Sequence, residues 1–347
     1  MRVLVVGLGS MGKRRLRCLE ALGFAASSLT GFDLREDRRS QAAVLHPGSA
    51  FYGDLDEAVR AHEPEALIIS VPPDVHHLYI RRAIEGRRPF FVEASVVDDG
   101  LEEFKMVCNQ NGLLAAPSAT LCFHAGVKLV FETVRSGVLG RISNILYHSG
   151  QYLPDWHVYE PVSAYYVSNP LTGGAREIVP FELTWLTALF GFPGRVCGYY
   201  RKTITIEGAE KIDDTYNALL DYGDFLMNLS VDVVSRIAVR RLLINGDKGQ
   251  LRWDWDENAI SLYEAASGRW SRLPYCSGQA HDGYNVNIGE AMYIDEMKTF
   301  IQAVRGEAHF PNTLENDHQV LKLLYALEES DRNSTIVHIP FAGKRVI

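Results

Sequence analysis

Three glycines directly after the first apolar run of the chain place the strongest constraint on its fold. Gly7, Gly9 and Gly12 follow the letters VLVV at residues 3–6, and Ser10 and Met11 complete the turn. Leucines 16, 19 and 22 then recur at helical spacing up to Gly23, which suits a helix end. Glycine permits a tight turn, close approach of a ligand to the backbone, and close packing of helix on strand. The pattern therefore predicts a strand–turn–helix unit whose helix N-terminus can hold an anionic group.

Short apolar runs alternate with amphipathic helical patterns from residue 1 to about residue 117. The runs are VLVVG, LTGFD, ALIISV, PFFVE and GLLAA, and none has a polar face. Buried strands separated by helices form a parallel sheet with right-handed crossovers. Asp33 ends the second run, 21 residues after Gly12, where a carboxylate binds the adenine ribose in dinucleotide-binding folds. The sequence predicts a Rossmann domain in which Asp33 favours NAD over NADP. Arg35 is the residue that could instead accommodate a 2′-phosphate, or it is a solvated loop residue.

Length and composition limit the remaining possibilities. A chain of 347 residues is expected to form two domains, which we place at residues 1–120 and 121–347. A net charge of −8 without a basic block argues against nucleic acid as a partner. The five cysteines are widely spaced and the histidines lack ligand spacing, so neither disulfides nor a metal are expected. The apolar runs are too short to span a membrane, and residues 1–9 leave no room for a signal peptide, so we expect a cytoplasmic protein.

The pattern changes after about residue 118 to longer runs with polar alternation. Turn signals stand at residues 222–224 and 245–249, and helical patterns follow at about 289–304 and 313–329. These features predict an α+β domain with a large, mostly antiparallel sheet.

With these motifs in place, the chain resembles the glucose-fructose oxidoreductase / inositol dehydrogenase / MocA (Gfo/Idh/MocA) family over nearly its whole length. The stretch IISVPPDVHHLYIRRAIEGRRPFFVEAS is similar to the segment from T-P-x-x-x-H to E-K-P, and FHAGVKLVFETVRSGVLGRI to the entry into the second domain. GGAREIVPFELTWLTALFG is similar to a glycine-rich D-x-x-x-H helix ending in L-F-G. The resemblance implies a sugar-like substrate, a homodimer or homotetramer, and cofactor contacts from Val71, Pro72, His76, Glu93 and Ala94.

Two positions depart from the family pattern. In the family, the Lys of E-K-P and the His of D-x-x-x-H position the substrate hydroxyl and move its proton. Here the motifs place Ala94 and Ser95 at the Lys and Pro positions, and Glu177 and Phe181 at the Asp and His positions. Neither alanine nor phenylalanine can transfer a proton. The cofactor side is thus retained while the usual acid–base pair is missing, although Phe181 still falls in the substrate region.

Replacements are available in the polar, aromatic stretch from residue 150 to 177. His157 is our first choice for proton transfer, because the ordinary pKa of histidine lies near neutrality; an ordinary loop histidine is the alternative. Glu177 is expected to bind substrate hydroxyls and is a second catalytic candidate. Further candidates are the phenols of Tyr152, Tyr165 and Tyr166, Trp156 for stacking on a sugar, Arg176 for clamping an anionic group or forming a salt bridge, and Glu182.

Two further histidines need an interpretation. His76 falls in the loop near the nicotinamide in the family, or is simply a residue at a helix start. His124 is expected to open the first helix of the second domain, where Cys122 replaces an Arg often found in the family.

We therefore expect an NAD-dependent oxidoreductase acting on a sugar, nucleotide sugar or cyclitol-like compound. A reductase of C=N or C=C bonds is the alternative within enzymes, because no alcohol is then deprotonated. A non-catalytic NAD-binding protein with a degenerate site is the alternative outside them.

Overall fold

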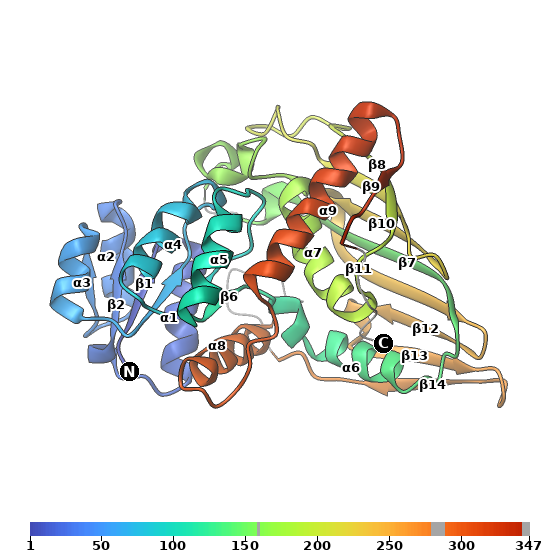
Figure 1. The fold of residues 1–347 in the computed structure, drawn as a ribbon, viewed down its shortest axis with the longest axis horizontal. Coiled ribbons are helices and arrows are strands. Elements are labelled where there is room, and N and C mark those ends of the chain that lie inside the picture. The colour runs from blue at the N-terminus through green and yellow to red at the C-terminus, as the bar shows by residue number, and fades with distance from the viewer. Residues whose placement is uncertain (158–159, 279–288, 342–347) are drawn as a thin grey trace. The chain divides into compact units, whose positions relative to one another are not determined.

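The computed structural model describes residues 1–157, 160–278 and 289–341. The chain divides into two compact units (Figure 1). Unit 1 contains Met1–Thr120 and Met292–His318, and unit 2 contains Leu121–Ala291 and Gln319–Ile347. The predicted fold class, a Rossmann domain followed by an α+β domain, is confirmed.

Unit 1 is built on a six-stranded sheet in the order β3-β2-β1-β4-β5-β6. All its described strand pairs are parallel. Its strands are β1 (Val3–Val6), β2 (Leu29–Phe32), β3 (Ala50–Tyr52), β4 (Ala66–Ile69), β5 (Phe90–Val92) and β6 (Ala115–Pro117). Its helices are α1 (Ser10–Ala21), α2 (Glu36–Leu45), α3 (Leu55–His62), α4 (His76–Glu85), α5 (Leu101–Asn111), α8 (Glu290–Val304, from Met292 on) and the first turn of α9 (Leu314–Asn333). Single 3-10 turns are η1 (Ala26–Ser28) and η2 (Pro73–Val75), and η3 (Thr120–Phe123) begins at Thr120 and continues into unit 2.

The sheet has its topological switch between β1 and β4, because β1 leads to β2 on one side and β4 lies on the other. Both central strands are entirely buried, as their continuous apolar letters predict. Ligands of such folds bind outside the carboxyl ends of the strands at this switch. Strand β3 was not predicted, because it is a three-residue edge strand with a partly exposed side and no apolar run.

The segment Met292–His318 packs with unit 1, whereas the sequence pattern assigned it to the second domain. Phe300 of α8 and Phe310 after it both place their rings against Phe91 of β5, with centroids 5.9 and 6.1 Å away. This apolar surface is the reason for the correction. Helical periodicity identifies an apolar face but does not identify the sheet that the face covers.

Unit 2 is built on a nine-stranded sheet in the order β14-β13-β12-β11-β7-β10-β9-β8-β15. Strands β7 and β10 pair in parallel, and the other described pairs are antiparallel. Its strands are β7 (Ile142–Tyr152), β8 (Arg195–Arg201), β9 (Thr215–Asp221), β10 (Leu226–Asp232), β11 (Val234–Gly246), β12 (Gly249–Asp254), β13 (Ala259–Glu264), β14 (Arg269–Pro274) and β15 (Val337–His338). Its helices are α6 (Ala125–Arg135), α7 (Ala175–Phe190) and the rest of α9, with 3-10 turns η4 (Leu153–Asp155), η5 (Val162–Ala164), η6 (Tyr166–Ser168) and η7 (Trp255–Glu257).

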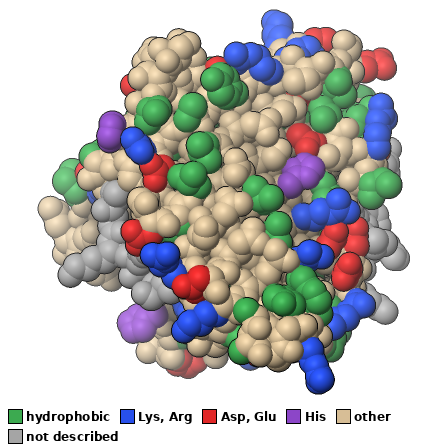
Figure 2. All heavy atoms as spheres, turned by 90° about the vertical axis from the view of Figure 1, so that its right-hand side faces the viewer, with side chains coloured by type: hydrophobic (Ala, Val, Ile, Leu, Met, Phe, Trp, Pro, Cys, Tyr) green, Lys and Arg blue, Asp and Glu red, His purple; other side chains and the backbone are tan. Residues whose placement is uncertain are grey.

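Helices α6 and α7 lie on one face of this sheet (Figure 1). That face buries Trp185 of α7 against Trp253 of β12, with ring centroids 6.1 Å apart. The opposite face forms a broad hollow of about 1150 Å³. Leu146, Leu219 and Tyr199 lie there with 40% or more of their surface exposed. Apolar, basic and acidic side chains are mixed over this side of the molecule (Figure 2).

None of the helices in the described part of the chain is long and apolar enough to cross a membrane.

Candidate cofactor and substrate sites

The glycine loop of unit 1 has the geometry that the sequence predicts. Gly7 has a φ of +90°, and a Cβ there would collide with the Ser70 carbonyl at the end of β4. A Cβ on Gly12 would overlap the carbonyl oxygen of Gly7. Among the described residues, a Cβ on Gly9, the N-cap of α1, would instead meet only the Arg38 guanidinium, 3.6 Å away. The loop is therefore tight on the protein side and open at the helix N-terminus, beside the half-buried Ser10 and Met11.

Asp33 is held at the end of β2, next to this loop. Its Oδ2 accepts a hydrogen bond from Leu8 N at 2.8 Å, and its Oδ1 accepts one from Arg35 N at 2.9 Å. The Arg35 side chain turns away and donates to Asp37 at 2.6 Å. Arg38 instead lies 3.7 Å from the Asp33 carboxylate. Of the two interpretations of Arg35, the exposed side chain bound to Asp37 fits a solvated loop residue, and Arg38 is the arginine whose side chain lies beside the Asp33 carboxylate.

The turn after β4 is fixed by His76. The ring Nε2 donates to the Val71 carbonyl at 2.9 Å, directly before Pro72. Burial lowers the pKa of His76 to about 4, so the ring is neutral at physiological pH. Its Nδ1 is buried and has no hydrogen-bond partner within the described residues. His76 thus orients the loop in which the sequence predicts cofactor contacts from Val71, Pro72 and the ring itself.

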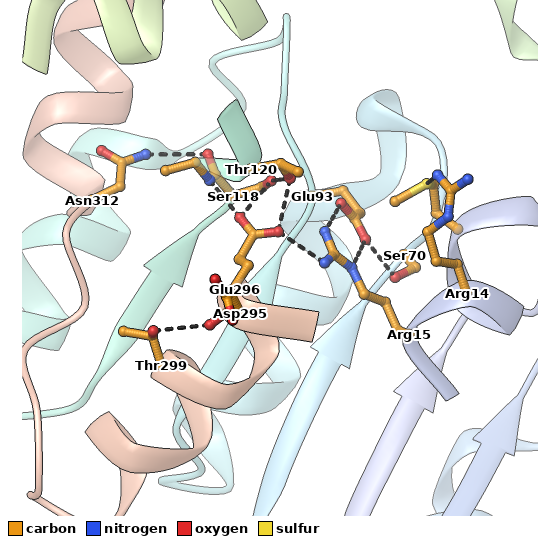
Figure 3. Close-up of polar contacts among 12 residues, drawn as sticks. Arg14, Arg15, Ser70, Glu93, Ser118, Thr120, Asp295, Glu296, Thr299 and Asn312 are labelled. Carbon is orange, nitrogen blue, oxygen red and sulfur yellow. Dashed lines mark hydrogen bonds and ion pairs between the residues drawn. The ribbon is translucent and has the colours of Figure 1, made fainter. Parts of the chain in front are cut away.

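Glu93, at the end of β5, has its carboxylate bound inside the protein. Arg15 donates to it from Nε at 2.7 Å and from Nη2 at 2.8 Å, and Ser70 Oγ donates at 3.1 Å (Figure 3). Both carboxylate oxygens of Glu93 thus accept bonds from the protein, so the structure gives this residue a supporting role, and its contact with the cofactor stays a prediction. Ala94, which follows, is half-buried and offers no polar side chain.

In unit 2, the predicted substrate residue Glu177 lies in the first turn of α7. Its Oε1 accepts a hydrogen bond of 2.5 Å from the Tyr166 hydroxyl, while its Oε2 is buried without a partner in the described chain. Burial raises the pKa of this carboxyl to about 7, and the Tyr166 hydrogen bond opposes part of that rise. A carboxyl that titrates near neutrality can accept or release a proton at physiological pH.

His157, the first candidate for proton transfer, belongs to the same aromatic cluster. Its ring stacks on Tyr165 with centroids 4.5 Å apart, and Tyr165 lies edge-on to Tyr166 at 6.1 Å. His157 Nδ1 lies 2.8 Å from Glu160 Oε1. Trp156 is half-buried, and its indole Nε1 has no hydrogen-bond partner among the described residues. The structure thus brings His157, Tyr165, Tyr166 and Glu177 together.

Two other predicted residues serve the fold instead. Arg176 donates from Nε to Glu328 at 2.6 Å, so its salt-bridge interpretation holds and the substrate clamp is withdrawn. Glu182 is completely buried and accepts hydrogen bonds from Tyr147, Ser149, Trp185 and Arg240. Such a saturated carboxylate has no surface left for substrate.

The remaining candidates lie elsewhere in unit 2. Tyr152 ends β7, with the Arg236 guanidinium 3.9 Å over its ring. Phe181 is half-buried one turn after Glu177. His124 is the N-cap of α6 and accepts from Gly126 N at 3.1 Å, as expected for a residue that opens this helix. Burial lowers the pKa of His124 to about 4. Cys122 is half-buried in η3.

Comparison with known families agrees with this geometry. Residues 1–110 match the model of the oxidoreductase family with an NAD-binding Rossmann fold, and residues 127–252 match the C-terminal domain of the same family. The two matches together cover more than half of the chain. The chain belongs to the Gfo/Idh/MocA family. The predicted resemblance is thereby confirmed, and unit 1 contains the NAD-binding fold of this family.

Individual Gfo/Idh/MocA relatives are distant. The uncharacterized oxidoreductase YhhX of Escherichia coli K12 is 22% identical over 231 residues, which is 66% of this chain and 64% of that protein. The inositol 2-dehydrogenase of Leifsonia xyli is 26% identical over 107 residues, 31% of each chain. The chain thus matches less than two thirds of the length of either relative.

Among solved structures, levoglucosan dehydrogenase in complex with NADH aligns over 98% of this chain and 99% of its own. The TM-score is 0.83 at 15% sequence identity, so this likeness shows the fold.

The residues of this Gfo/Idh/MocA chain fit NAD. Gly9 caps the N-terminus of α1 and leaves it open to a ligand. Asp33 lies beside this loop at the end of β2, where it accepts from Leu8 N. Gly7, Gly9, Gly12 and Asp33 would hold the pyrophosphate and the adenine ribose.

The sequence motifs do not single out Arg15 and Glu296, which form a buried ion pair in unit 1. Arg15 follows Gly12 by three positions, so a charge on the apolar side of α1 was the available signal. Nothing local marks Glu296 as its partner, because the two residues are 281 positions apart.

Proposed function

We propose that this protein is an oxidoreductase that transfers a hydride between NAD and a sugar, nucleotide sugar or cyclitol-like substrate. Membership of the Gfo/Idh/MocA family supports the reaction class. The names of an inositol dehydrogenase and a levoglucosan dehydrogenase among similar proteins support a neutral polyhydroxylated ring as the substrate. Bound NAD supplies the hydride acceptor for oxidation, and NADH the donor for reduction.

The observation that carries the chemical part of this proposal is the Glu177–Tyr166 pair. When an alcohol is oxidised, its hydroxyl proton must leave as hydride departs from carbon. Glu177 Oε2 is the proposed acceptor, since it has no partner in the described part of the chain and burial raises the pKa of the carboxyl group to about 7. Tyr166 is a positioning residue, because its hydroxyl holds Oε1 and aims the other oxygen. The pair takes the place of the Lys and His of the family motifs, since this chain has Ala94 and Phe181 at those two positions.

The surroundings of Glu177 favour a neutral substrate. The nearest predicted cation, Arg176, is bound to Glu328. The aromatic cluster of His157 and Tyr165, together with Trp156, offers flat surfaces of the kind on which sugar rings stack. The Trp156 indole nitrogen can donate to a hydroxyl, since it has no partner among the described residues.

The proposal is tested by assaying NAD reduction with inositols, anhydrosugars and hexoses. With the best substrate, Glu177→Gln should lower kcat by about 10²-fold or more while leaving NADH affinity unchanged. The wild-type rate of oxidation should rise with pH and level off above pH 7, because the carboxylate is the active form. The pH profile of Glu177→Gln should lack this rising limb.

Glu210→Gln is the matched control, since Glu210 is an exposed carboxylate that caps its own loop at Gly208 N. It should behave as wild type. Normal turnover in Glu177→Gln would remove Glu177 from the mechanism and return His157 to first place. Turnover of imines or enones without any turnover of polyols would favour the C=N or C=C reductase. NADH binding without turnover of either class would favour the non-catalytic protein.

We also propose that the open face of the large sheet packs on a second copy of the chain, giving a homodimer or homotetramer. The exposed Leu146, Leu219 and Tyr199 support an apolar contact. Arg241 and Asp254 form an ion pair at 2.5 Å in the same hollow. The face therefore carries both positive and negative charge, and two copies of it can pack together without a net repulsion.

A further inference from the structure

A buried ionic cluster in unit 1 is not used by the proposed chemistry (Figure 3). Its centre is Arg15 of α1, whose side chain is completely buried. Besides its two bonds to Glu93, Arg15 donates from Nη1 to Glu296 Oε2 of α8 at 2.8 Å. Glu296 is also completely buried, so three charged groups share one site inside the protein.

Glu296 in turn binds the chain segment that follows β6. Its Oε1 accepts from Ala119 N at 2.7 Å and from Ser118 Oγ at 3.1 Å, and its Oε2 accepts from Thr120 Oγ1 at 2.7 Å. Every oxygen of the two carboxylates therefore has a donor. Such a complete set of partners makes buried charges tolerable and geometrically strict.

The guanidinium stays charged in this environment. Burial acts to lower the pKa of Arg15, but the two carboxylates outweigh it and raise the pKa above its ordinary value. The guanidinium carbon of Arg15 lies 4.5 Å from the centre of the Phe91 ring and 5.4 Å from that of the Tyr293 ring, so two aromatic rings also hold the guanidinium in place. Arg15 is thus a rigid point to which several elements are attached.

These elements are the ones that form one half of the dinucleotide crevice. Glu93 leads into Ala94 after β5, and Ser70 leads into the Val71–Pro72 turn after β4. The Ser70 carbonyl lies directly against Gly7 of the loop. In a sheet of this order, the adenosine half of NAD lies toward β2, and the nicotinamide half lies beyond the switch, toward β4 and β5. Asp33, at the adenosine side, makes no bond to the cluster in the described contacts.

We propose that Arg15, with Glu93 and Glu296, positions the nicotinamide half of the cofactor without touching it. The cluster fixes the turns at residues 70–72 and 93–94, and α8 contributes the second carboxylate from far along the chain. Sites held by such supporting bonds lose binding and rate when the support loosens by about an ångström. The inference rests on NAD binding and not on the proposed substrate or on Glu177.

The test compares three ligands that share the adenosine half. Glu296→Gln keeps the size of the side chain but removes one charge and two of the acceptor lone pairs that the donors use. The dissociation constant of NADH, measured by calorimetry, should rise about tenfold, the effect of one charge-assisted hydrogen bond. Those of AMP and ADP-ribose, which lack nicotinamide, should stay within about twofold of wild type.

Thr299→Ala is the matched control on the same helix, since the Thr299 hydroxyl donates to the backbone carbonyl of Asp295 and makes no described bond to the cluster. It should change none of the three constants. Ser70→Ala removes the single hydroxyl that donates to Glu93, and it replaces Glu296→Gln in the test if that variant does not fold. Of the three dissociation constants, it should raise only that of NADH, by about threefold. An equal loss of affinity for AMP, ADP-ribose and NADH would overturn the proposal, because it would show that the cluster supports the whole fold. Unchanged NADH binding in folded variants would also overturn it.

Discussion

At the scale of single residues, Glu177 and Glu182 of α7 show how partners decide what a carboxyl group can do. Glu182 accepts hydrogen bonds from four side chains, including the buried Arg240, and is a closed part of the core. Glu177 accepts a hydrogen bond from Tyr166 on one oxygen, and its other oxygen is buried without a partner in the described ranges. Burial, which the Tyr166 hydrogen bond offsets only in part, raises the pKa of Glu177 to about 7. The two residues have the same chemistry in the sequence and different chemistry in the fold.

The role of Tyr166 can be separated from that of Glu177. In the wild type, the hydrogen bond from Tyr166 to Oε1 lowers the pKa of Glu177, and Tyr166→Phe removes this donor. The pKa should therefore rise further, by about one unit for a hydrogen bond of ~1.4 kcal/mol. The limb in the pH profile of oxidation should move to higher pH, so the rate at pH 7 falls while the plateau is largely kept. A limb at the wild-type position would show that Tyr166 does not control Glu177.

At the scale of elements, α7 is attached to its sheet by a buried ion pair rather than by apolar packing alone. Glu182 Oε1 lies 2.6 Å from Arg240 Nη2 of β11, and Arg240 is only 3% exposed. Removing one partner of such a pair leaves an uncompensated charge in the core. The ion pair at Glu182, five positions after Glu177, therefore fixes the helix that carries Glu177 to the sheet.

Glu182→Ala should destabilise the protein by about 3–5 kcal/mol, because the Arg240 charge stays buried without its partner. The midpoint of urea unfolding, followed by circular dichroism, measures this effect. Glu207→Ala, at an exposed loop position of the same unit, should change stability by less than about 0.5 kcal/mol. A loss of that small size in Glu182→Ala would contradict the structural role assigned to the pair.

At the scale of the whole molecule, the open face of the nine-stranded sheet predicts association. Light scattering of the purified chain should give a mass of two or four copies. Leu219→Asp places a charge in the hollow of this face and should shift the mass toward one copy. Leu45→Asp, on the exposed end of α2 in unit 1, should leave the mass unchanged. A monomeric wild type at micromolar concentration would refute the interface.

The sequence by itself determined the local units and the binding fold of this protein. The apolar runs, the glycines at 7, 9 and 12 and Asp33 specify backbone conformation and burial within a few residues of one another, so periodicity and spacing suffice to predict them. The family motifs added the order of the two domains, and that prediction is confirmed. The roles of the candidate site residues stay predictions.

Only the tertiary structure decided which side chains meet. It placed α8 with unit 1, gave Arg15 a partner 281 positions away and bound Arg176 to Glu328. It also left Glu177 with a buried oxygen that has no partner among the residues that the structure describes. Charge, pKa and availability for substrate depend on desolvation and on neighbours contributed by distant segments. Spacing along the chain carries no information about these contacts. The sequence therefore offered Glu177 only as one of several catalytic candidates, and the fold supplied the burial on which our proposal for it rests.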